Sequence, residues 1–190
     1  MPRAPRVHVS DGIYHVVIRG DNREPVFVDD FDRQEYLRLL HSSKAKLEFL
    51  LYAYALMTNH IHLLLSPGER TTISSIMHVL SLTYTKYFNR RYDRVGHLYQ
   101  GRFHSTLVDS EHYLLEVLRY IHLNPMEAGM VHHPRDYPWT SYHSYLGPQE
   151  NQQPPRLVDT AFMLGVLERM DSFEALIESG IKPVPGTHGM

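Results

Sequence analysis

The order of apolar and polar positions along the chain predicts four strands and three helices. Alternating β-branched and aromatic residues are typical of strands, whereas apolar residues recurring every three to four positions are typical of helices. Strands are expected at 13–20, 47–57, 60–66 and near 102–108, and helices at 29–46, 71–92 and from Asp109 or Ser110 to near Asn124. The last helix is expected to end before Pro125, because the residue before a proline disfavours helical backbone.

This β-α-β-β-α-β order, followed by a further helix, indicates an α+β fold. Such a split β-α-β arrangement forms an antiparallel sheet with two helices on one face, and it leaves the other face for a site or for the third helix. The length of 190 residues indicates one domain, which we place at 1–147. Residues 148–190 are expected to form a linker (148–156) and an acidic helical extension that is partly disordered, above all in its last ten residues.

The composition excludes some classes of site. The chain contains no cysteine, which excludes cysteine-bound zinc and disulfide scaffolds. It has no apolar run of the roughly 18 residues that a membrane span requires. Its first residues lack the apolar segment of a signal peptide. We therefore expect a cytoplasmic protein without a membrane partner.

Basic residues are concentrated in one segment of a chain whose formal net charge is −2. Tyr84–His104 carries five basic residues and one acidic residue. Such a segment can follow the phosphates of a nucleic acid while neighbouring aromatic rings stack on bases. The alternative is a solvated surface. The candidate DNA-binding residues in this segment are Lys86, Arg90, Arg91, Arg94 and Arg102.

His60 and His62 interrupt the apolar stretch ALMTNHIHLLLS, and alternation along a strand places both on one face. Ile61, Leu63 and Leu65 point to the opposite face, which we expect the helices to cover. Two imidazoles arranged in this way can converge on one metal ion. Alternatively, they are hydrogen-bonded histidines on a half-exposed strand, since a chain with 14 histidines forms such pairs by chance. We assign four other histidines to packing or hydrogen bonding: His15, His104, His112 and His122.

Tyr120 and Asn124 lie one turn apart on the last predicted helix of the domain, so they share a face. The amide oxygen of Asn124 and two imidazoles would be three neutral ligands, which leave a divalent ion its full charge for stabilising a phosphate. This ligand set favours Mn²⁺ or Mg²⁺. A phenol held beside that phosphate is a candidate nucleophile. The alternative is that Tyr120 is a boundary residue of an amphipathic helix and Asn124 a helix terminator.

Several collinear blocks carry a resemblance to a known family. They are YHVVIRGDNREPVF, YALMTNHIHLLL, YTKYFNRRYDRVGHLYQGRF and YLLEVLRYIHLNPMEAG, followed by YPWTSYHSYLG. Over roughly Arg6 to Gly147, the chain resembles the single-tyrosine transposases of the His-hydrophobic-His class. More narrowly, it resembles the REP-associated tyrosine transposases. The order, histidine pair first and tyrosine later, is similar to that of these transposases and opposite to that of conjugative relaxases.

The resemblance implies a ferredoxin-like α+β fold with an extra helix that carries the tyrosine. It implies that single-stranded DNA, commonly with a hairpin, is cleaved and rejoined through a 5′-phosphotyrosine on Tyr120. The implied ligands of Mg²⁺ or Mn²⁺ are His60, His62 and Asn124. Arg3 and Arg6 form a short basic arm, which we expect to enter the groove of a DNA hairpin. Related transposases indicate a monomer or a homodimer.

Two functions of other classes stay open at this point. A domesticated and catalytically silent protein would bind hairpin DNA without cleaving it. A metal-dependent hydrolase would use water in place of the tyrosine, so that Tyr120→Phe would retain cleavage.

Overall fold

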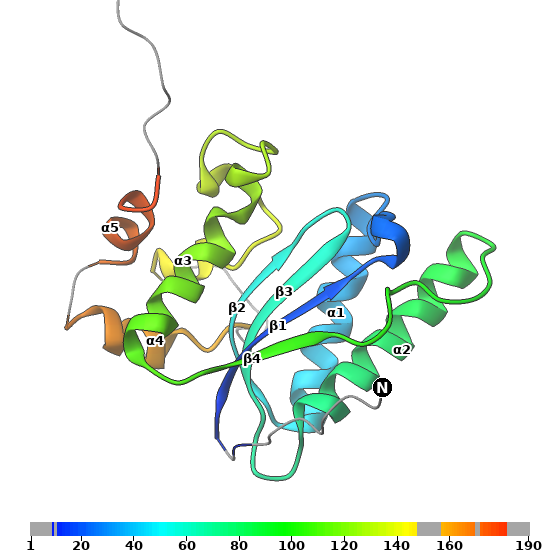
Figure 1. Ribbon diagram of the computed structural model, residues 1–190, viewed down its shortest axis with the longest axis horizontal. Coiled ribbons are helices and arrows are strands. Elements are labelled where there is room, and N and C mark those ends of the chain that lie inside the picture. The colour runs from blue at the N-terminus through cyan, green and yellow to red at the C-terminus, as the bar shows by residue number, and fades with distance from the viewer. Residues whose placement is uncertain (1–8, 10, 148–156, 170–171, 182–190) are drawn as a thin grey trace, which may run out of the picture.

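The computed structural model describes residues 9, 11–147, 157–169 and 172–181, which surround a four-stranded antiparallel sheet (Figure 1). The strands are β1 (Ile13–Arg19), β2 (Leu50–Leu56), β3 (His60–Ser66) and β4 (His104–Val108), in the spatial order β2-β3-β1-β4. Helix α1 (Asp30–Leu47) connects β1 to β2, α2 (Ile73–Arg91) connects β3 to β4, and α3 (Glu111–Glu127) follows β4. The predicted α+β fold is confirmed.

The two faces of the sheet are covered by different helices (Figure 1). Helices α1 and α2 pack side by side on one face, where Val16 and Ile18 of β1 are buried. Helix α3 lies against β2 and β3 on the other face. The register pairs His62 with Val17 and His60 with Arg19, so these residues alternate along the strands with Val16 and Ile18, which point to the opposite face. The histidine pair therefore faces α3, on the face of the sheet that we predicted to be free for a site or for the third helix.

Side-chain caps set the helix starts. Asp29, Thr72 and Ser110 each accept a hydrogen bond from a backbone N–H in the first turn of α1, α2 and α3. At the other end of α1, Glu48 adopts a left-handed conformation with φ of 53°. This break explains why β2 begins at Leu50, three residues later than the strand predicted from Leu47.

The prediction that the third helix ends near Asn124 is wrong, because α3 continues through Pro125 to Glu127. Proline lacks its own N–H, which removes one hydrogen bond of the helix. The next turn forms nonetheless: the N–H of Ala128 donates to the Asn124 carbonyl, and that of Met130 donates to the Pro125 carbonyl. Asn124 is thus held in regular helix, one turn beyond Tyr120.

Residues beyond the predicted boundary at 147 pack onto the core. They form two short helices, α4 (Thr160–Leu167) and α5 (Phe173–Glu178), where one run of helical sequence was expected. Met163, Phe173 and Ile177 are buried, and α5 lies against α3. The predicted linker (148–156) and residues 182–190 lie outside the described residues, and the disorder expected there stays a prediction.

The free edge of β2 is covered by irregular chain, which removes a site for unwanted strand pairing. Thr140 forms a bridge with Ala55, and the backbone N–H of Asp159 donates to the Leu51 carbonyl. The Asp159 carboxylate accepts from the Leu51 N–H and pairs with Lys44 at 2.7 Å. Three short 3₁₀ turns complete the secondary structure of the described chain: Asp21–Arg23, Pro134–Asp136 and Tyr142–Tyr145.

None of the helices in the described parts of the chain has the length and apolar character needed to cross a membrane.

Candidate active site

A cluster of three histidines and one tyrosine lies between the sheet and α3. The ring centroids of His60 and His62 on β3 are 4.9 Å apart. His15 of β1 stacks on His62 at 5.2 Å, and Tyr120 of α3 meets the His62 ring edge-on at 5.5 Å. Residues separated by up to about a hundred positions in the chain are thus in direct contact. The predicted convergence of the histidine pair and Tyr120 is present in the structure.

His62 is buried, with 3% of its surface exposed, and its two ring nitrogens differ. Nδ1 shares a 3.0 Å hydrogen bond with Nε2 of His15. Nε2 is buried and has no hydrogen-bond partner within the described part of the chain. A buried polar atom without a partner is costly, so this nitrogen is suited to binding an atom that the protein itself does not supply.

The hydrogen bonds of His60 fix its tautomer. Nδ1 lies 2.7 Å from Oδ1 of Asn59, and the Asn59 amide nitrogen donates to the Arg23 carbonyl. A carbonyl oxygen only accepts, so the Nδ1 of His60 must carry the proton. The Nε2 of His60 then keeps its lone pair, which is the form that binds a metal.

The environment keeps all three imidazoles neutral. Burial, followed by the proximity of His60, His15 and Arg19, lowers the pKa of His62 to about 2. Burial, followed by the proximity of His104, lowers the pKa of His15 to about 4. The pKa of His60 is also lowered, first by burial and then by Arg19, while the neighbouring Asn124 side chain opposes this. At neutral pH, the lone pairs of His60 and His62 are therefore available to a cation.

Tyr120 and Asn124 differ in exposure although they share one face of α3. Tyr120 is 43% exposed, so a large substrate can reach its phenol oxygen. Asn124 is 8% exposed, and its side chain lies beside the His60 ring. The more exposed residue is thus the candidate nucleophile, and the buried one is the candidate ligand.

The residues present fit a divalent ion of the Mg²⁺ or Mn²⁺ type. No three His, Cys, Asp or Glu side chains among the described residues form a metal-binding group, so the third protein ligand would have to come from another residue type. Asn124 supplies an amide oxygen next to His60. Two imidazole nitrogens and one amide oxygen suit Mn²⁺ or Mg²⁺ better than a structural zinc ion.

The family comparison identifies the chain. Residues 8–124 match the model of the family described as "Transposase IS200 like". The chain belongs to the IS200-like transposase family. The matched region contains the histidine pair and Tyr120, and it ends at Asn124.

Individual relatives agree with the narrower resemblance. A Haemophilus influenzae protein with the provisional name REP-associated tyrosine transposase is 25% identical over 148 residues, covering 73% of this chain and 84% of that protein. A solved REP-associated tyrosine transposase bound to a REP hairpin superimposes with a TM-score of 0.65 at 18% identity, covering 85% of this chain and 96% of that structure. The resemblance to REP-associated tyrosine transposases is confirmed.

In this IS200-like transposase, His15 is the site residue that the sequence did not reveal. It was assigned to packing or hydrogen bonding, and its hydrogen bond is to a predicted metal ligand. The only signal in the sequence was its position in a strand, because pairing of β1 with β3 places His15 diagonally next to His62. The assignment of His122 to packing or hydrogen bonding is confirmed. Its side chain is fully buried and forms hydrogen bonds with the Leu118 carbonyl and the Ser141 hydroxyl.

The predicted DNA-binding residues fall into three groups in this transposase. Lys86, Arg90 and Arg102 are exposed and pair with no carboxylate among the described residues. Arg91 and Arg94 instead form ion pairs: Arg91 with Asp29 and Asp32, both at 2.6 Å, and Arg94 with Glu24 at 2.9 Å. Arg3 and Arg6 lie outside the described residues.

Proposed function

We propose that this transposase cleaves and rejoins single-stranded DNA through Tyr120, with a divalent ion held by His60, His62 and Asn124. The observation that carries the proposal is the edge-on contact of Tyr120 with His62, whose buried Nε2 has no partner within the described residues. An accessible phenol and an orphaned imidazole nitrogen on the same face are what phosphoryl transfer to tyrosine requires.

In the proposed reaction, the Tyr120 oxygen attacks the scissile phosphorus. A bond forms between that oxygen and phosphorus while the bond to the 3′-oxygen breaks. The phenol proton passes to solvent and the leaving 3′-oxygen takes up a proton, which yields a 5′-phosphotyrosine and a free 3′-hydroxyl. Attack by a 3′-hydroxyl on the phosphotyrosine reverses the step and joins strands. One phosphoester replaces another, so no external energy source is needed.

The protein residues prepare this step by orientation. Asn59 holds the His60 ring through Nδ1, and His15 holds the His62 ring through Nδ1, so that each Nε2 is left for the ion. The Asn124 amide lies beside the His60 ring. A bound divalent ion would supply Lewis-acid polarisation of a phosphate oxygen.

The substrate we propose is DNA with a hairpin and an adjoining single strand. The similar solved structure is bound to a REP hairpin, which supports hairpin recognition here. Exposed Lys86, Arg90 and Arg102 provide positive charge for backbone phosphates. All four proposed catalytic and ligand residues come together within one protomer, and we propose that the protein acts as a monomer or a homodimer.

The test is an incubation with Mn²⁺ and labelled hairpin DNA taken from the sequence flanking the protein's own gene. Wild type and Tyr120→Phe are compared on a denaturing gel, with Tyr113→Phe as a control for another tyrosine of α3. We expect a protein–DNA adduct with wild type and Tyr113→Phe and none with Tyr120→Phe.

The other outcomes separate the alternatives. Cleavage by both wild type and Tyr120→Phe without any adduct would indicate a hydrolase that uses water. A complex on a native gel, with Mn²⁺ bound but no cleavage, would indicate a silent DNA-binding protein. Either result would overturn the proposed tyrosine chemistry.

A further inference from the structure

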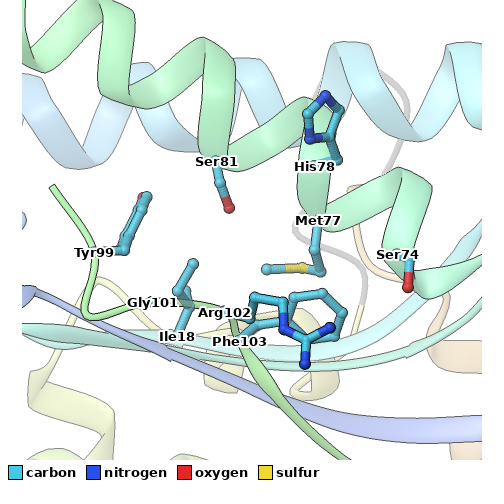
Figure 2. A pocket seen from close by; sticks show the side chains of 9 residues that line it. All are labelled: Ile18, Ser74, Met77, His78, Ser81, Tyr99, Gly101, Arg102 and Phe103. Atoms are coloured by element: carbon cyan, nitrogen blue, oxygen red, sulfur yellow. The ribbon is translucent and has the colours of Figure 1, made fainter. Parts of the chain in front are cut away.

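Arg19, the last residue of β1, is an exposed cation on the face of the sheet that carries the candidate active site. Its neighbour Ile18 points the other way: Figure 2 shows the Ile18 side chain directed toward α2, where it lines a hollow together with Met77. Side chains alternate along a strand, so Arg19 faces the side of α3. The register sets Arg19 directly opposite His60, and the Cα atoms of such a pair are about 5 Å apart. Arg19 therefore lies beside a predicted metal ligand.

The backbone on both sides of Arg19 is held in place. The Arg19 carbonyl accepts a hydrogen bond of 2.9 Å from the Gln100 N–H, and the N–H of Gly20 donates to the Asn59 carbonyl at 2.8 Å. Asn59 is also the residue that holds the His60 ring. The Arg19 side chain thus starts from a fixed point next to the site.

The guanidinium of Arg19 is available to a ligand. It forms no ion pair and no side-chain hydrogen bond within the described parts of the chain. Arg91 and Arg94, by contrast, are each held by carboxylates. An exposed guanidinium without a carboxylate partner can bind an external anion, and its planar fork of donors matches a phosphate.

The charges around the histidines favour an anion at this position. Arg19 is the largest cause, after burial, of the lowered pKa of His60, and it also lowers the pKa of His62, after burial and two neighbouring histidines. No carboxylate of the described chain contributes to the lowered pKa of His15, His60 or His62. A divalent ion on these neutral ligands would therefore lie near a second positive charge, with no acidic side chain to offset either. A phosphate in contact with both would offset them.

We propose that Arg19 binds the DNA phosphate that Tyr120 attacks and stabilises the negative charge on its non-bridging oxygens. Arg19 is then a catalytic residue in addition to the predicted nucleophile and ligands, and β1 supplies it. The guanidinium keeps its protons and forms no covalent bond in the reaction. This inference rests on the proposed function, because it takes a phosphate of DNA as the reacting group.

Loss of the Arg19 charge should affect DNA binding and metal binding in opposite directions. DNA binding in EDTA, without any ion, should weaken because an arginine–phosphate contact is lost. Mn²⁺ binding by the protein without DNA should strengthen, because the repulsion between the ion and the guanidinium is removed. A residue that only maintained the shape of the site would weaken both when it is replaced.

Arg19→Gln removes the charge and keeps much of the side-chain length. Arg70→Gln is the matched control, since Arg70 is an exposed arginine beyond the other end of β3. Fluorescence anisotropy in EDTA measures affinity for a hairpin with a single-stranded flank, and electron paramagnetic resonance measures free Mn²⁺ without DNA. We expect Arg19→Gln to weaken DNA binding roughly 10-fold and to strengthen Mn²⁺ binding about threefold. Arg70→Gln should match wild type in both, and Arg19→Lys should restore part of the DNA affinity.

Neutral methylphosphonate substitutions locate the contact. In wild type, neutralising the scissile phosphate, mapped from cleavage in Mn²⁺, should weaken binding, and Arg19→Gln should cause no additional loss on that DNA. At a phosphate of the hairpin stem, the two losses should add. Should Arg19→Gln fail to give a folded circular dichroism spectrum, Arg19→Thr takes its place, because threonine suits a strand.

Three results would overturn the role of Arg19. They are wild-type DNA affinity of the folded variant in EDTA, Mn²⁺ affinity that is not raised, and additive losses at the scissile phosphate. Failure of the proposed function is seen separately: wild type would form no Tyr120-dependent adduct, although its DNA affinity still depended on Arg19 and on one phosphate of the flank.

Discussion

At the scale of single residues, the candidate site depends on which nitrogen of each imidazole carries a proton. Asn59 settles this for His60 because its carbonyl oxygen only accepts. For His62, the partner is another histidine at 3.0 Å, so the two rings set each other's tautomer. If the Nε2 of His62 binds an ion, its Nδ1 must donate to the Nε2 of His15. His15 is then a positioning residue for a metal ligand.

Replacing His15 tests this role through metal binding, independently of activity. His15→Phe removes the acceptor, and we expect Mn²⁺ affinity to fall about 10- to 100-fold. His15→Gln keeps a carbonyl acceptor and should restore much of that affinity. Electron paramagnetic resonance of free Mn²⁺ measures both variants, with His112→Phe as a control at an exposed histidine. A His15→Phe variant that binds Mn²⁺ as wild type does would refute the positioning role.

The site residues that lie close together within one strand or one helix could be predicted from the sequence. The site residue that depends on the pairing of two strands could not. His60 with His62, and Tyr120 with Asn124, follow from the periods of a strand and a helix. His15 is 47 positions from His62, and only the register of β1 on β3 brings them together. The apolar pattern of a single sequence predicts where strands lie, but it does not predict which residues of two strands pair with each other.

At the scale of elements, a network around Asp32 ties the start of α1 to the end of α2. Asp32 is fully buried and accepts from Arg91, Tyr87 and Tyr92, all on or next to α2. Asp29 also binds Arg91, which raises the pKa of that guanidinium and lowers the pKa of the Asp29 carboxyl. This network holds together the two helices that cover one face of the sheet.

Arg91 is therefore expected to act mainly on stability, although the sequence placed it among the DNA-binding candidates. Arg91→Ala leaves the buried Asp32 carboxylate with weaker partners, and we expect the free energy of unfolding to fall clearly. Exposed Arg90→Ala should change it by less than about 0.5 kcal/mol. Urea denaturation measures both. Unchanged stability of Arg91→Ala together with weakened DNA binding would restore the original interpretation.

The element pattern was predictable because each core strand and helix has a clear period, but some boundaries were not. The left-handed residue that ends α1 is a glutamate, which carries no such signal in sequence. Pro125 is a strong helix-ending signal, and the structure accommodates it in the last turn of α3. Both differences arise where tertiary packing outweighs local preference.

At the scale of the whole molecule, the C-terminal helices support the helix that carries Tyr120. Phe173 of α5 stacks on Tyr145 at 4.6 Å and meets the buried His122 of α3 edge-on at 5.2 Å. The predicted domain, 1–147, contains Tyr145 and His122 but not Phe173, which packs on both. The described part of the extension thus shares a core with the domain.

A single substitution tests whether the extension and the domain unfold together. Phe173 is 2% exposed, and Phe173→Ala should lower the free energy of unfolding by about 3 kcal/mol in one cooperative transition. Phe162→Ala on α4, where the ring is 50% exposed, should have a smaller effect. Denaturation followed by circular dichroism measures both. A separate early transition in Phe173→Ala, with the main transition unchanged, would show that 1–147 is stable by itself.

The most direct test of the account is the position of the covalent bond to DNA. Wild-type protein is incubated with Mn²⁺ and hairpin DNA, denatured, digested with trypsin and nuclease, and analysed by mass spectrometry. Cleavage after Arg119 and Arg135 releases a peptide that begins with Tyr120 and contains no other tyrosine. We predict a nucleotide on Tyr120 of this peptide. An adduct on any other residue, or cleaved DNA with this peptide wholly unmodified, would contradict the assignment of Tyr120 as the nucleophile.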